Sequence, residues 1–123
     1  MQMIAIAAGG AMGALLRFWV SAGVHGVAGR SFPYGTLTVN VAGSLLLGIL
    51  YVVFNERFDV SPHLRALLMV GVLGAFTTFS TFSIETLELL EKGDILKAAA
   101  NVLLNVVLCV GAAWVGVTAA RFW

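Results

Sequence analysis

Long uninterrupted apolar runs make up most of this chain, and short polar stretches separate them. A helix that crosses the hydrocarbon core of a membrane needs about 20 mostly apolar residues. Four runs come close to this length, and their apolar positions are continuous rather than alternating, which disfavours a transmembrane β-barrel. The pattern therefore predicts an all-α membrane protein with four transmembrane helices, at about residues 3–24, 37–54, 64–90 and 98–120.

The polar stretches between the runs carry signals for helix ends. Ser61 directly precedes Pro62, which is typical of a helix start, because Ser caps free N–H groups and Pro fits the first turn. Gly93 follows the third run and is typical of a helix stop. Since the sequence shows no internal repeat and no second domain, we expect a single four-helix transmembrane domain over residues 1–123.

Composition agrees with a membrane protein and excludes several other classes. Hydrophobic residues make up 60% of the chain and charged residues 11%, with a mean hydropathy of +0.99, whereas a soluble domain carries about 25% charged residues. The formal charge of +1 provides no basic surface for a nucleic acid. The single cysteine, Cys109, excludes an intrachain disulfide. No nucleophile–base pair, metal-ligand spacing or phosphate loop predicts an enzyme.

Basic residues are divided evenly between the two ends of the predicted helices. The more basic side normally stays in the cytoplasm, so an even division predicts insertion in both orientations and an antiparallel, dual-topology homodimer. The alternative is that six charges are too few to reveal the topology. The three basic residues on the side of the termini are Arg57, Arg65 and Arg121, and those on the other side are Arg30, Lys92 and Lys97.

The centre of the third run is unusually polar. Residues 71–83 hold five hydroxyl side chains and two glycines. Hydroxyl side chains compete with the helix for backbone hydrogen bonds, and glycine permits backbone conformations that other residues resist. This pattern predicts a third helix that is broken mid-membrane, between about Gly74 and Thr78. Unwound backbone at that depth must be buried or line a cavity, and its carbonyls would suit a small alkali cation where two copies meet. The alternative is a kinked helix without an ion.

Phenylalanines alternate with hydroxyl residues through the same segment. The edge of an aromatic ring is the positive end of its quadrupole, so it can contact an anion. Ring edges beside hydroxyl donors indicate a narrow path for a small anion, although a Phe stripe is also compatible with plain packing. The phenylalanines are Phe76, Phe79 and Phe82, and the hydroxyl residues among and after them are Ser80, Thr81 and Ser83.

Two other runs each place polar side chains on one helix face at four-residue spacing. A buried amide requires hydrogen-bond partners, so these groups either line a pathway or join helices to one another. The second run carries Asn40, Ser44 and Gly48, and the fourth carries Asn101, Asn105 and Cys109.

Charged residues within the runs are candidates for a vestibule. Arg17 lies well inside the first run, where a cation either lines a wet vestibule that attracts anions or extends to the interface. Glu85 lies deeper in the third run than the two glutamates after it. It is a candidate vestibule acid or partner of a basic side chain.

Three motifs in order resemble those of the small bacterial fluoride channels, the Fluc or CrcB family. They are GGAMGALLR at 9–17, GTLTVN at 35–40 and GAFTTFSTFS at 74–83. The resemblance covers nearly the whole chain, and its third motif is the most specific.

The resemblance implies a passive, fluoride-selective channel that exports fluoride across the bacterial inner membrane. It also implies two pores per antiparallel dimer and a structural sodium ion (Na+) on the two-fold axis. Cys109 departs from a serine that many members carry, and Gly74-Ala75 replaces a Gly-Gly. The residues that the resemblance implies are Asn40, Phe79, Phe82, Ser80, Thr81, Ser83 and Cys109 for the pore, Arg17 and Glu85 for the vestibule, and the carbonyls of Gly74 and Thr77 for Na+.

The main alternative is a small multidrug-resistance-type transporter, which is also short, has four spans and often has dual topology. Such a transporter requires a membrane-embedded carboxylate in its first span. Here that span carries Arg17 and no acidic residue.

Overall fold

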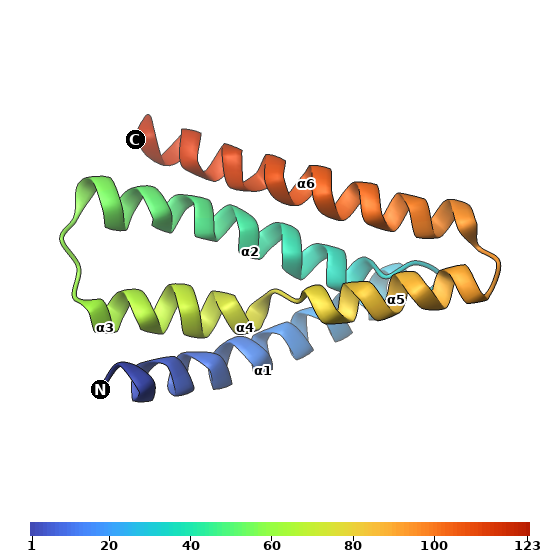
Figure 1. Cartoon of the computed structure of the whole chain (residues 1–123), viewed down its shortest axis with the longest axis horizontal. Helices are drawn as coiled ribbons and strands as arrows, with labels where there is room; N and C mark the ends of the chain where they lie inside the picture. Colours follow the sequence, from blue (N-terminus) through green and yellow to red (C-terminus); the bar gives the residue numbers. More distant parts are fainter.

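The computed structural model describes residues 1–123 and is entirely helical. Four long helical segments run side by side along the long axis of the molecule (Figure 1). Each is long and apolar enough to cross a membrane, as the sequence predicts: at about 1.5 Å per residue, 27 residues extend about 40 Å. The segments are α1 (Gln2–Ala28), α2 (Tyr34–Val52) with η1 (Val53–Arg57), α3 to α5 within Pro62–Glu91, and α6 (Ile95–Arg121).

The third segment is composed of several pieces. It begins at α3, where the Ser61 hydroxyl accepts a hydrogen bond from the Leu64 N–H at 3.2 Å, so the predicted cap is confirmed. A glycine with a positive φ of 81°, Gly93, follows its last turn and confirms the predicted stop. The pieces are α3 (Pro62–Arg65), the wider π-helical η2 (Ala66–Leu73), α4 (Gly74–Phe76) and α5 (Phe79–Glu91).

Extended backbone separates α4 from α5. Thr77 has φ −85° and ψ 157°, and Thr78 has φ −151° and ψ 122°. Gly74 itself is still helical, with φ −61° and ψ −38°. Figure 1 places this interruption near the middle of the long axis, where α4 and α5 meet. The chain therefore exposes peptide groups to side-chain partners halfway along the molecule.

Glycines hold the helices close together around this interruption. A Cβ atom on Gly48 would overlap the carbonyl of Ala113, and one on Gly116 would overlap the carbonyl of Leu45, so α2 and α6 pack backbone to backbone. A Cβ atom on Gly43 would overlap the methyl group of Thr77. Close approach through small residues is typical of helices that pack in membranes.

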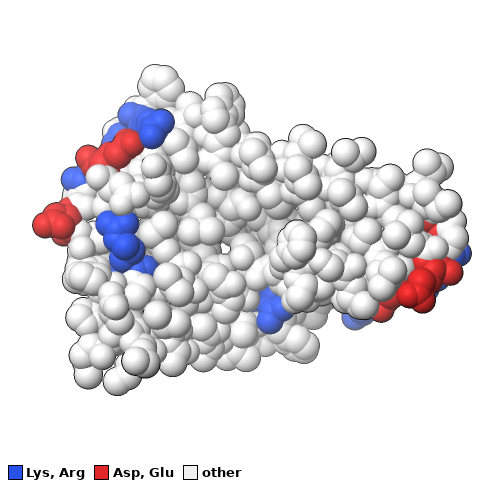
Figure 2. Space-filling model, in the orientation of Figure 1, with Lys and Arg blue, Asp and Glu red and all other residues white.

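Charged side chains gather at the two ends of the molecule, with a largely uncharged surface between them (Figure 2). The termini and the connection between η1 and α3 lie at one end, and the other two connections lie at the opposite end (Figure 1). At the first end, Arg121 and Glu56 form an exposed ion pair of 2.8 Å. Many large apolar side chains on the helices are exposed to the surroundings, as lipid-facing surface requires.

Candidate functional site

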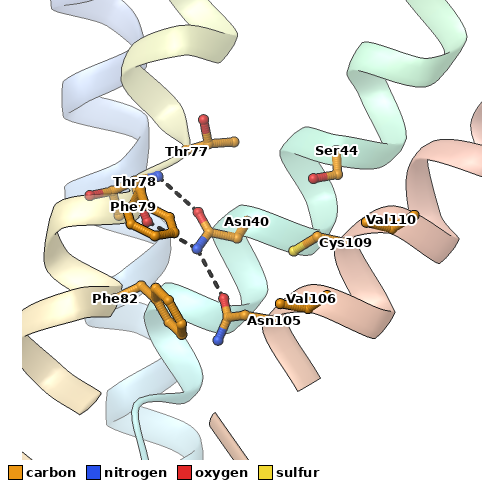
Figure 3. Close-up of a pocket in the computed structure, with 10 residues that line it drawn as sticks. All are labelled: Asn40, Ser44, Thr77, Thr78, Phe79, Phe82, Asn105, Val106, Cys109 and Val110. Carbon is orange, nitrogen blue, oxygen red and sulfur yellow. Dashed lines mark hydrogen bonds between the residues drawn. The ribbon is translucent and has the colours of Figure 1, made fainter. Parts of the chain in front are cut away.

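The side chain of Asn40 on α2 binds both peptide groups of Thr78 (Figure 3). Its Oδ1 accepts the Thr78 N–H at 2.8 Å, and its Nδ2 donates to the Thr78 carbonyl at 3.1 Å. Nδ2 also donates to Oδ1 of Asn105 on α6 at 3.1 Å. An amide Nδ2 has two N–H bonds, so both are donated to protein acceptors. The side chain thus stabilises the extended backbone by replacing the helical partners of Thr78.

A chain of buried side-chain hydrogen bonds continues from Asn105 to α5. Nδ2 of Asn105 donates to the carbonyl and to Oδ1 of Asn101, at 2.9 and 3.0 Å. Nδ2 of Asn101 donates to the Thr86 hydroxyl at 2.9 Å, and that hydroxyl donates to the Phe82 carbonyl at 2.8 Å. Asn101 is fully buried and Asn105 is 6% exposed. Of the two interpretations of these asparagines, hydrogen bonds between helices are therefore confirmed.

Carbonyl groups at the interruption, including those of Gly74 and Thr77, lack the backbone donors that a continuous helix would give them. In an α-helix, each N–H donates to the carbonyl four residues before it. The Thr78 N–H donates to Asn40 instead of to Gly74, and the Thr81 N–H donates to the Thr78 hydroxyl at 3.2 Å instead of to Thr77. No other backbone N–H donates to Gly74 or Thr77 outside the regular helices. The carbonyl oxygens of Gly74 and Thr77 are therefore available to a cation.

A pocket of about 320 Å³ lies beside the interruption, between α2, α5 and α6 (Figure 3). Phe79 and Phe82 contact each other there, with ring centroids 5.3 Å apart and planes tilted by 54°. Phe82 is buried, whereas Phe79 is 78% exposed. Phe76 is buried elsewhere, because the extended residues separate it from the other two rings. The lining residues are Asn40, Ser44, Thr77, Thr78, Phe79, Phe82, Asn105, Val106, Cys109 and Val110.

A second pocket, of about 350 Å³, lies on the other side of Thr78 and is more polar. It contains both predicted vestibule residues, Arg17 and Glu85, together with Thr81. Neither Arg17 nor Glu85 forms an ion pair, and Oε1 of Glu85 is buried without a hydrogen-bond partner. Thr78 lines both pockets. The two pockets therefore meet at the residue that Asn40 holds.

Two of the predicted pore hydroxyls lie outside both pockets. Ser80 and Ser83 are exposed on α5, and the Ser83 hydroxyl donates to the Phe79 carbonyl at 2.9 Å. The structure thus brings together Asn40, Phe79, Phe82 and Cys109 in one pocket, and leaves these two serines on the surface.

Five residues that line the first pocket are not among those that the resemblance implies for the site. They are Ser44, Thr78, Asn105, Val106 and Val110. The four-residue spacing of Asn40 with Ser44 and of Asn105 with Cys109 marks Ser44 and Asn105 as candidates for a pathway or for contacts between helices. No sequence pattern marks Thr78, Val106 or Val110 as lining residues.

The chain matches known proteins over almost its full length. The family model described as "CrcB-like protein, Camphor Resistance (CrcB)" matches residues 4–117. A relative from Methylococcus capsulatus is 59% identical over 121 residues, which are 98% of this chain and 53% of that protein, so the chain spans about half of that relative's length. Relatives from Pseudoalteromonas translucida (50% identical, 90% of this chain and 92% of that protein) and Alteromonas mediterranea (58% identical, 91% and 88%) match over most of both chains. All three relatives are named fluoride-specific ion channel FluC. The chain therefore belongs to the CrcB-like family.

Proposed function

We propose that this chain is a passive, fluoride-selective ion channel that exports fluoride across the bacterial inner membrane. The observation that carries the proposal is its membership of a family whose relatives, up to 59% identical, are named fluoride-specific ion channels. Four apolar helices and a pocket that combines aromatic rings with polar groups at mid-length support it. An ion channel is not an enzyme, and no covalent step is required.

The membrane potential supplies the driving force for export. Hydrogen fluoride crosses bilayers as the neutral acid and dissociates inside the cell, where the anion is trapped. A negative-inside potential of 100 mV is worth about 2.3 kcal/mol per elementary charge, which corresponds to an about fiftyfold lower internal fluoride concentration at equilibrium. Chloride must be refused, because its free passage would collapse the same potential.

The path that we propose passes from the Arg17 pocket, past Thr78, to the pocket lined by Phe79 and Phe82. Arg17 attracts the anion by its charge, since no carboxylate pairs with it. Thr78 lies where the two pockets meet. The ring edges of the two phenylalanines then offer positive potential in an apolar setting.

We further propose that the chain works as an antiparallel, dual-topology homodimer with two pores. In a bilayer, the open pocket would leave polar side chains such as that of Asn40 facing lipid, which is costly unless protein covers them. The basic residues are three at each end of the molecule, so they favour neither orientation. A second copy in the opposite orientation would cover the mid-length interruption of the first with its own.

A structural sodium ion fits the interruption. The donor set would be the carbonyl oxygens of Gly74 and Thr77, whose helical N–H partners are diverted to side chains. Unwound backbone carbonyls within a membrane are typical Na+ ligands, and two copies would supply four of them. The bound ion would offset the repulsion between carbonyl oxygens that meet where the two copies exclude water.

The proposed function is tested by fluoride and chloride efflux from liposomes that contain the purified protein. We expect rapid fluoride release and no chloride release. Equal release of both ions, or release of neither from folded and inserted protein, would refute it.

A further inference from the structure

The start of α2 has no hydrogen-bond cap of its own. The first N–H groups of a helix have no partner within the helix, and a polar side chain just before it usually accepts one of them. The residue in that place is Pro33, which has no polar side-chain atom and forms no cap hydrogen bond. The N–H of Gly35, in the first turn of α2, therefore needs an acceptor from elsewhere.

His25, near the end of α1, supplies this acceptor. Its Nε2 accepts the Gly35 N–H at 3.1 Å. Gly35 is buried, and a Cβ atom on it would lie 3.0 Å from the imidazole, so the absence of a side chain permits this close approach.

The hydrogen bond to Gly35 requires a neutral imidazole. A neutral ring accepts at one nitrogen and carries its proton on the other, whereas a protonated ring donates at both. The proton of neutral His25 is therefore on Nδ1. When Nε2 also gains a proton, two N–H donors face each other and the anchor at the start of α2 is lost.

This anchor lies beside the path that we propose for fluoride. His25 lines the polar pocket that contains Arg17. Thr36, the residue after Gly35, lines the same pocket and is only 4% exposed. A displacement of the first turn of α2 would therefore move a wall of this pocket.

Charged groups of both signs surround His25. The ring also lines a third pocket, of about 390 Å³, among the α1–α2 connection, the end of α5 and the start of α6. In the two pockets the acidic residues are Glu85, Glu88 and Asp94, and the basic residues are Arg17, Arg30, Lys92 and Lys97. The helix α2 contains no acidic or basic residue. His25 forms an ion pair with none of these groups, so no salt bridge holds the ring in its charged form.

We propose that His25 is a positioning residue of the conduction path, which anchors the start of α2 when neutral and releases it when protonated. Histidine is the side chain whose charge ordinarily changes between about pH 5 and 8. Acid should therefore lower fluoride conduction by loosening a wall of the Arg17 pocket. The effect on conduction rests on the proposed function, whereas the effect on the anchor does not.

Two substitutions of His25 separate the acceptor from the titratable proton. His25→Gln keeps an acceptor oxygen near the place of Nε2 but gains no proton in this pH range. His25→Leu removes the acceptor at every pH. The matched control is His63→Gln, because His63 is the only other histidine, is exposed on α3 and lines neither polar pocket.

Fluoride current across a planar bilayer, with equal pH on both sides, measures the effect on conduction. Current counts the ion alone, since the neutral acid that crosses lipid carries no charge. We expect the current of the wild type and of His63→Gln to fall about fivefold or more from about pH 8 to about pH 5. The current of His25→Gln should change by less than about twofold over the same range, and that of His25→Leu should be low throughout.

The melting temperature of the purified protein tests the anchor without transport. Acid titrates other groups in every variant, so the comparison is made at equal pH. At about pH 8 we expect the wild type and His25→Gln to melt within about 1 °C of each other. At about pH 5 we expect the wild type to melt about 2–4 °C lower than His25→Gln.

The outcomes separate the role of His25 from the proposed function. A wild-type current that is constant or rises in acid, or an equal fall in His25→Gln, would overturn the role of His25 in conduction. Equal melting temperatures of the wild type and His25→Gln at both pH values would overturn the anchor itself. A folded wild-type protein without fluoride current at either pH would refute the channel, and the melting temperatures would still decide whether His25 anchors α2.

Discussion

Replacing Asn40 by aspartate tests how the interruption of the third segment is held. The aspartate oxygen at Oδ1 can still accept the Thr78 N–H. The second oxygen replaces Nδ2, and it would face the Thr78 carbonyl and Oδ1 of Asn105, both of which are acceptors. Two favourable hydrogen bonds thus become two contacts between acceptors, with almost no change in side-chain volume.

The size of this effect follows from the two acceptors that lose their donor. A buried polar group left unsatisfied costs about 1–3 kcal/mol, so two cost roughly 2–6 kcal/mol. If conduction requires the native arrangement of Thr78, this penalty lowers its population by about thirtyfold at the least. We therefore expect Asn40→Asp to reduce fluoride efflux by about thirtyfold or more.

Liposome efflux with a fluoride electrode measures the effect, and size-exclusion chromatography checks that the variant is folded. Thr38→Val is the matched control, since Thr38 is exposed on the same helix and donates only to the Tyr34 carbonyl. We expect that variant to conduct normally. If folded Asn40→Asp released fluoride within about threefold of the wild-type rate, the hydrogen bonds of Asn40 would not control conduction.

Three other perturbations address separate parts of the site. Phe82→Ile keeps an apolar side chain but removes the positive ring edge, so we expect fluoride efflux to fall about tenfold or more in the same assay. Gly43→Ala places a methyl group against Thr77 and should lower both the melting temperature, by several degrees, and the efflux, whereas Gly111→Ala meets no atom within 4 Å and should change neither. Replacing sodium by a large organic cation should lower the melting temperature of the purified protein, and an unchanged value would remove the sodium proposal.

The helices could be predicted from the sequence because apolar run length sets the number of spans. The ends lie up to four residues beyond the predicted ones, as in α1, which begins at Gln2 and ends at Ala28. Apolar runs mark the hydrocarbon core, and helices continue past it. The π-helical turns of η1 and η2 were not predicted, since no residue pattern marks them.

The site could be predicted in part. The hydroxyl and glycine pattern indicates where helical bonding weakens, and four-residue spacing indicates which side chains share a face. Neither shows which acceptor each donor uses. That Asn40 gives both N–H bonds to Thr78 and Asn105 depends on how α2, α5 and α6 pack together.

The reversal potential of the purified protein in a planar bilayer tests passive fluoride selectivity most directly. With a tenfold fluoride gradient and equal chloride on both sides, a passive fluoride channel should reverse near 59 mV. The value should not move when a pH gradient is added. A reversal potential near zero, or one that follows the pH gradient, would contradict passive, fluoride-selective conduction.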